Sequence, residues 1–116
     1  MRYLCVVRKE YIMKNYENKR NGTSFRGYLL ASYYDIVSLY SKPINCINNG
    51  KIDAEWVFNT PYGTATIYNY KDGKAYLGDE GIDVTKICEW HIGGKNIETY
   101  NWVKRRFYEY KIKSLS

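Results

Sequence analysis

Two segments of alternating polarity, joined by a four-residue turn, constrain the fold of this chain more than any other feature. In residues 53–58 (D-A-E-W-V-F), the apolar Ala54, Trp56 and Phe58 alternate with Asp53, Glu55 and Val57, which is the period of a half-buried strand. Residues 60–63 (T-P-Y-G) suit a hairpin connection, because proline fits the second turn position and glycine tolerates positive φ. Residues 64–70 then return as a strand. Its two predicted faces are Ala65, Ile67 and Asn69 on one side, and Thr64, Thr66, Tyr68 and Tyr70 on the other.

The segments before this hairpin predict two strands and a helix. Residues 2–13 and 25–31 are rich in Tyr, Val, Ile and Leu, which favour strands. Ser32 stands three residues before Asp35, the spacing of a capping box, so we expect a helix from there to about residue 41. Pro43 ends it, because the residue before a proline avoids helical angles.

The segments after the hairpin predict one or two strands and a second helix. Residues 74–77 are expected to form a short strand, and residues 89–92 a last strand that closes at a glycine pair. Asn96 can cap a C-terminal helix. The apolar face of that helix is expected to consist of Tyr100, Val103, Phe107 and Tyr110. The whole chain, residues 1–116, is therefore expected to be one α+β domain: an antiparallel sheet of about five or six strands with two helices packed on one face.

Composition narrows the class of partner. The chain has 116 residues, a formal net charge of +6, 14 tyrosines and three tryptophans. Basic charge with many rings favours an anionic, stackable partner such as a nucleotide or nucleic acid. Codon bias in an AT-rich genome, which over-uses Lys, Asn, Tyr and Ile, explains the same composition equally well.

The chain carries no sequence signal for a membrane, export or a metal. No apolar run is long enough to span a bilayer, and the first residues do not resemble a secretory signal, so a cytoplasmic protein is expected. The three cysteines, Cys5, Cys46 and Cys88, share no paired spacing and predict reduced, buried thiols. Together with a single histidine they do not form a zinc set, so neither a metal nor a cofactor is expected.

Catalysis has one candidate residue. His91, flanked by Trp90, is the only histidine and could act as a general base, but no nucleophile or second titrating group stands beside it in a known motif. A structural histidine at a strand end is the alternative that the pattern favours. We therefore expect a protein that is not an enzyme and has no catalytic residue.

A binding site is expected on the aromatic segments around the hairpin and the last strand. If one sheet face packs on the helices, the tyrosines at 68 and 70 are exposed and can stack on a base; a subunit interface made of the same rings is the open alternative. The glycine pair before the C-terminal helix could bind a phosphate, although a tight turn without a ligand is the interpretation that the pattern favours. The expected ligand-binding residues are Tyr68, Asn69, Tyr70, Lys71, Trp90, His91, Gly93, Gly94 and Lys95.

A run of three basic residues lies in the C-terminal helix. Lys104, Arg105 and Arg106 form the densest positive segment of the chain. Such a run is ordinarily a solvated helix face, and contact with phosphates or nucleic acid is the alternative.

Five segments resemble a family of small phage and prophage proteins. They are residues 27–37, 42–43, 50–58, 62–73 (Y-G-T-A-T-I-Y-N-Y-K-D-G) and 89–94 (E-W-H-I-G-G). By size, element order and phage setting, although not by a residue motif, the chain is also similar to the Thoeris anti-defence sponges, which sequester a cyclic ADP-ribose signal without cleaving it.

The resemblance implies a phage-encoded anti-defence protein of the infected host cytoplasm. It would bind and sequester a small nucleotide immune signal of the cyclic ADP-ribose or cyclic oligonucleotide type. A homo-oligomer is expected on separate grounds, because rings on both sheet faces with only two helices to cover them leave one face open. Two alternatives stay open: an anti-CRISPR-type inhibitor that contacts a host defence protein or its guide RNA, and a nucleic-acid-binding protein that uses the basic run.

Overall fold

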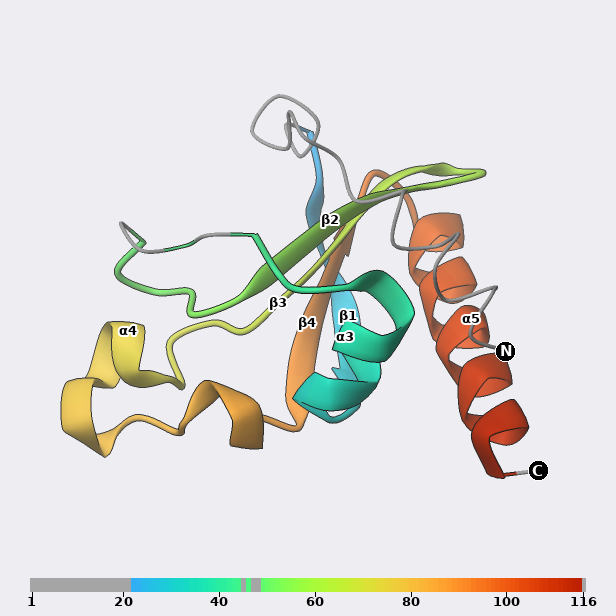
Figure 1. The fold of residues 1–116 in the computed structure, drawn as a ribbon. Coiled ribbons are helices and arrows are strands. Elements are labelled where there is room, and N and C mark those ends of the chain that lie inside the picture. Colours follow the sequence, from blue (N-terminus) through green and yellow to red (C-terminus); the bar gives the residue numbers. More distant parts are fainter. Residues whose placement is uncertain (1–21, 45, 47–48, 116) are drawn as a thin grey trace.

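The computed structural model describes residues 22–44, 46 and 49–115, and this part of the chain folds around one antiparallel sheet (Figure 1). The strand order is β1-β4-β3-β2. The strands are β1 (Ser24–Leu30), β2 (Glu55–Thr60), β3 (Gly63–Tyr68) and β4 (Glu89–Gly94), and the α-helices are α3 (Tyr33–Tyr40), α4 (Lys74–Leu77) and α5 (Ile97–Leu115). The α+β class with an antiparallel sheet is confirmed. Within the described residues there are four strands and three α-helices, however, not the expected five or six strands and two helices. The strand expected at residues 2–13 lies outside the described part.

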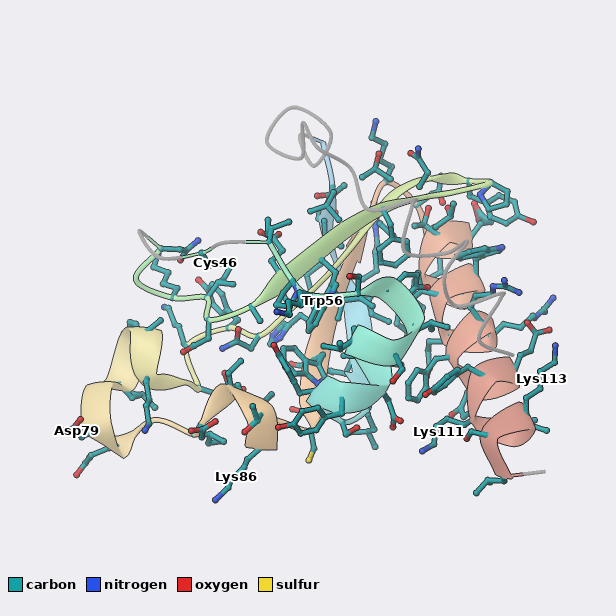
Figure 2. All side chains as sticks on the ribbon, viewed as in Figure 1. Cys46, Trp56, Asp79, Lys86, Lys111 and Lys113 are labelled. Carbon is teal, nitrogen blue, oxygen red and sulfur yellow. The ribbon has the colours of Figure 1, made fainter. Side chains whose placement is uncertain are left out.

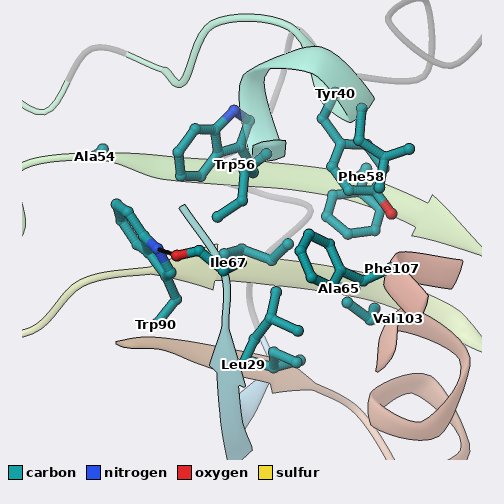
Figure 3. Close-up of a cluster of buried hydrophobic side chains, with 14 of the residues drawn as sticks. Leu29, Tyr40, Ala54, Trp56, Phe58, Ala65, Ile67, Trp90, Val103 and Phe107 are labelled. Carbon is teal, nitrogen blue, oxygen red and sulfur yellow. Dashed lines mark hydrogen bonds between the residues drawn. The ribbon is translucent and has the colours of Figure 1, made fainter. Parts of the chain in front are cut away.

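The predicted hairpin is confirmed as β2 and β3, which pair in register from Glu55 opposite Tyr68 to Thr60 opposite Gly63. One face of the sheet carries the core, with α3 and α5 packed on it (Figures 1 and 3). Its fully buried side chains from the strands are Trp56, Phe58, Ala65, Ile67, Trp90 and Ile92. The alternation read from residues 54–58 therefore selects the core face correctly.

Helix α3 begins where the capping box predicts. The Ser32 hydroxyl accepts a hydrogen bond from the Asp35 amide at 3.0 Å, which satisfies one free donor of the first turn. The Asp35 carboxylate bonds Lys111 of α5, with 3.2 Å between Oδ2 and Nζ. Figure 2 shows Lys111 on the side of α5 that faces α3. Asp35 thus takes part in the N-terminal cap of α3 and also links α3 to α5.

Residues 74–77 form helix α4 and not the expected strand. Lys71 has a φ of 62°, which turns the chain away from the sheet directly after β3. The Asp53 carboxylate then accepts a hydrogen bond from the Ala75 amide at 3.1 Å, in the first turn of α4. Two short 3₁₀ turns, η1 (Gly78–Glu80) and η2 (Val84–Lys86), complete the connection to β4.

Helix α5 has the predicted cap and the predicted apolar face. The Asn96 side chain accepts a hydrogen bond from the Thr99 amide at 2.9 Å. Val103 and Phe107 are buried, and Tyr100 and Tyr110 pack against the core. The helix therefore covers the sheet with the face that its 3.6-residue period indicates.

Candidate functional site

Five ring side chains meet on the sheet face opposite the helices, and we call them the ring cluster: Phe25, Tyr28, Tyr68, Tyr70 and His91. Strand register explains the central three. His91 is the Cα partner of Tyr28 on β1 and of Tyr68 on β3, so three adjacent strands each contribute one ring to a single row. Because Trp90 and Ile92 face the core, His91 between them must face the other way.

A β-bulge brings Phe25 to the same face as Tyr28. The register between β1 and β4 shifts between Phe25 and Gly27, so Arg26 has no partner of its own in the ladder. Without this extra residue, two positions three apart in a strand would point to opposite faces. Instead, the rings of Phe25, Tyr28 and His91 form a triangle with 5.1 Å between each pair of centroids.

Gly93 leaves room for the cluster. A Cβ built at this residue would lie 2.5 Å from the Thr66 hydroxyl oxygen and 3.6 Å from a ring carbon of Tyr68. Gly93 stands between Phe25 and Thr66 in the sheet, where any larger residue would fill the space under the rings. The glycine therefore provides a flat backbone floor beside the stacked Tyr68 and His91, whose centroids are 5.3 Å apart.

The cluster is partly open to solvent. Phe25, Tyr28 and Tyr70 are 46%, 48% and 40% exposed, respectively, which is high for rings that also contact one another. On the same face nearer β2, Val57 and Thr66 are buried. The exposed rings of the cluster therefore lie on β1, at Phe25 and Tyr28, and on the segment that follows β3, at Tyr70.

His91 at the centre has an unusual electrostatic environment. Its Nδ1 is buried without a hydrogen-bond partner. Desolvation lowers the pKa of the imidazole below its usual value of 6.5, although the negative charges of Asp72 and Glu89 act in the opposite direction. His91 is thus neutral at pH 7 and keeps one unsatisfied ring nitrogen among the aromatic side chains.

The Tyr68 hydroxyl within the cluster and the Lys71 ammonium beside it are two further polar groups. Burial raises the pKa of the Tyr68 hydroxyl, with a further contribution from the charge of Glu55, so this ring stays neutral. The Lys71 ammonium lies 5.3 Å from the ring centroids of both Tyr70 and Tyr76. A cation therefore stands at the edge of the ring cluster, held against two aromatic faces.

Two of the expected ligand-binding residues belong to the fold instead. Trp90 is fully buried in the core, where its indole nitrogen donates to the Ala31 carbonyl at 2.9 Å (Figure 3). Asn69 is also fully buried and makes four hydrogen bonds, to the amides of Asp53 and Ala54 and to the carboxylates of Asp53 and Asp72. All four hydrogen-bonding positions of its amide are occupied, so none is left for a ligand.

The glycine pair does not form a loop before the helix. Gly93 and Gly94 lie inside β4 and are paired with β1 on one side and β3 on the other. The Gly94 carbonyl also accepts a hydrogen bond from Arg26 Nε at 3.1 Å. Lys95 follows as an exposed residue, and its carbonyl accepts from Arg26 as well. The expected phosphate loop is therefore a strand end, and Lys95 is absent from the ring cluster.

The basic run spreads around α5, because successive helix residues are rotated by about 100°. Lys104 lies over the Tyr100 ring at 5.3 Å, Arg105 is exposed, and the Arg106 guanidinium lies over the Trp102 ring at 5.6 Å. The three charges therefore do not form one continuous face.

Sequence reasoning missed Phe25 and Tyr28, because strict alternation cannot anticipate the bulge at Arg26. The thiols also differ from the expectation that they are buried: Cys46 is half-buried and Cys88 is exposed, and Cys5 lies outside the described residues. In the described part of the chain, no group of three or more His, Cys, Asp or Glu side chains is arranged to hold a metal ion, and no helix has the length and apolar character to cross a membrane.

Comparison of the chain with protein-family models, with curated proteins and with solved structures finds no match.

Proposed function

We propose that this protein binds a small nucleotide on the ring cluster and retains it without chemical change. The observation that carries the proposal is the group of five rings centred on His91, three of them 40–48% exposed, which together offer flat surfaces on which a base can stack. Stacking needs no particular base identity, because every base has a π-face.

The polar groups of the cluster suit the remainder of a nucleotide. Lys71 supplies a positive charge beside Tyr70, where a phosphate could be paired, and the buried Nδ1 of His91 lacks a partner. The Lys71 ammonium lies at the edge of the same aromatic surface. This arrangement supports an anionic, planar ligand over an apolar one.

The same geometry supports binding over turnover. A histidine that acts as a general base is normally oriented by a hydrogen bond from its second nitrogen to a carboxylate or carbonyl. His91 Nδ1 has no such bond. We therefore propose a sequestering protein, in agreement with the anti-defence role that the sequence resemblance implies.

A second copy of the chain is proposed to complete the site. Exposed aromatic surface of this extent is usually covered by a ligand or a partner. A dimer that places two ring clusters together would enclose a base from both sides. Light scattering at tens of micromolar should give twice the mass of the chain, whereas a monomeric mass would contradict this part of the proposal.

The proposal is tested by binding and recovery of nucleotides. The full chain is titrated with cyclic ADP-ribose isomers and cyclic oligonucleotides by calorimetry, then denatured, and the supernatant is analysed by chromatography. Tyr68→Ala and Phe25→Ala should each weaken binding roughly 5- to 100-fold, the loss expected for one stacked ring. Tyr108→Ala, which removes a 60% exposed ring on α5, is the matched control and should bind normally.

Three outcomes would count against the proposal. Product in excess of one equivalent per site would identify an enzyme. No binding of any nucleotide, in a protein that still dimerises, would make the cluster a subunit interface only. Tight binding of duplex DNA that falls steeply with salt would favour the nucleic-acid alternative, because each neutralised phosphate adds to the salt dependence.

A further inference from the structure

A cavity of about 390 Å³ lies on the helix side of the sheet, away from the ring cluster. It lies between the C-terminal end of α3, the end of β2 with the following turn, and α5, and it is partly open to solvent. Its lining residues are Tyr40, Phe58, Asn59, Thr60, Pro61, Trp102 and Arg106. The volume falls in the range of roughly 300–1,000 Å³ that is typical of small-molecule sites.

Aromatic side chains form its walls. The rings of Tyr40 and Phe58 are stacked, with 4.1 Å between centroids and 19° between planes (Figure 3). Trp102 stands on α5 with the Arg106 guanidinium 5.6 Å from its ring centroid. Tyr40 and Phe58 are 3% and 1% exposed, whereas Trp102 is half-buried, so a planar ligand would find its main aromatic surface at Trp102.

Two buried polar atoms at this cavity have no partner. Tyr40 is 3% exposed, and its hydroxyl oxygen makes no hydrogen bond. The Arg106 Nε is buried and also makes none, although Nη1 of the same side chain is 3.5 Å from Glu109 Oε1. Buried polar atoms are nearly always satisfied in native proteins, so two unsatisfied atoms on residues that line one cavity indicate a missing acceptor.

We infer that this cavity binds a small planar ring compound that carries an anionic oxygen group, a carboxylate or a phosphate. The ring lies against Trp102, and the anionic oxygen accepts hydrogen bonds from Arg106 Nε and the Tyr40 hydroxyl. Because Tyr40 remains protonated at neutral pH, it is available as a donor. This site is independent of the ring cluster, with which it shares no residue.

The three tryptophans provide a site-specific readout. Trp56 and Trp90 are fully buried and donate their indole N–H groups to Ser41 and Ala31, whereas Trp102 lines the cavity. Each indole N–H gives a separate signal in an ¹H–¹⁵N spectrum of the full chain, assigned by Trp→Phe variants. Two anionic probes, adenosine 5′-monophosphate and 4-hydroxybenzoate, distinguish a phosphate from a carboxylate ligand. Adenosine is the neutral control.

We expect at least one anionic probe to shift the Trp102 signal saturably at up to roughly millimolar concentration, with the Trp90 signal unmoved. Arg106→Gln should weaken this binding about tenfold or more, the loss expected for a hydrogen bond to a charged group. Arg105→Gln, the same change at the neighbouring exposed residue, is the matched control and should bind normally. Tyr40→Phe should also weaken binding while its melting temperature does not fall, because no hydrogen bond of the free protein is lost.

The inference is overturned if neither anionic probe moves the Trp102 signal, or if adenosine binds as well as its monophosphate. It is also overturned if binding of the probes is lost in Tyr68→Ala but unchanged in Arg106→Gln. In that last case the ring cluster holds the ligand, so the proposed function stands while the second site does not.

Discussion

Replacing Asn69 by aspartate would test whether this residue supports the fold, as its contacts indicate, or a ligand, as the sequence suggests. The change keeps the size of the side chain and both oxygen-accepted bonds from the amides of Asp53 and Ala54. It removes the Nδ2 donor, which now lies 2.8 Å from Asp53 Oδ1 and 3.0 Å from Asp72 Oδ1. Asn69→Asp would therefore place a third carboxyl oxygen directly against two others.

Proton uptake by the introduced carboxyl limits how much Asn69→Asp can lower the free energy of unfolding. Two full charges about 3 Å apart would repel by roughly 5 kcal/mol at an effective dielectric constant of about 20, but the introduced carboxyl can take up a proton instead. For a carboxyl with an unfolded-state pKa of about 3.9, holding that proton at pH 7 costs roughly 4 kcal/mol, and at pH 4.5 about 0.8 kcal/mol. One lost hydrogen bond adds about 1 kcal/mol at either pH.

The pH dependence follows from the direction of that shift. The new carboxyl has a higher pKa in the folded state than in the unfolded state, so the folded protein binds more protons and loses stability as the pH rises above about 4. Relative to the natural sequence, Asn69→Asp should lower the free energy of unfolding by about 4–5 kcal/mol at pH 7 and by about 2 kcal/mol at pH 4.5.

Urea unfolding followed by tryptophan fluorescence at the two pH values measures both quantities. Asn101→Asp, the same substitution at an exposed position of α5, is the matched control and should change stability little. A loss of less than about 1 kcal/mol at pH 7, or an equal loss at the two pH values, would refute the assignment of Asn69 as a fully bonded structural residue.

Three further perturbations are informative. Since His91 has a lowered pKa in the folded state, the unfolded chain binds the proton more tightly, so the free energy of unfolding should decrease as the pH falls below about 6.5; urea titrations should show this decrease to be absent in His91→Gln. Gly93→Ala should cost about 1–3 kcal/mol, because its Cβ would meet the Thr66 hydroxyl, and a Thr66→Ala change in the same chain should restore part of that loss in thermal unfolding; no restoration would contradict the clash. Lys111→Ala should cost less than about 1 kcal/mol in the same assay, since its ion pair with Asp35 is partly exposed, and a larger loss would mean that the pair holds α5 in place.

The sequence by itself determines the local elements of this protein. The alternation around Trp56 and Phe58 predicts the buried face of a strand, and the turn that ends at Gly63 predicts a hairpin. The helical period of Val103 and Phe107 predicts the buried face of a helix. These signals depend on neighbours within a few residues, so they can be read without knowing the fold. They also place the Tyr68 side chain on the sheet face opposite the core.

Only the tertiary structure decides which of those residues share a site. Tyr28 lies beside His91 because the two residues are partners in the register between β1 and β4. Phe25 lies on the same face because the bulge at Arg26 adds one residue to β1 between Phe25 and Gly27. Trp90 lies one residue from His91 and yet faces the core, since successive strand residues alternate between faces. Arg106, which the sequence groups with two other basic residues, contributes a buried nitrogen to a cavity formed by α3, β2 and α5. The ring cluster and the cavity are both made of residues distant in sequence, whose proximity depends on packing between elements.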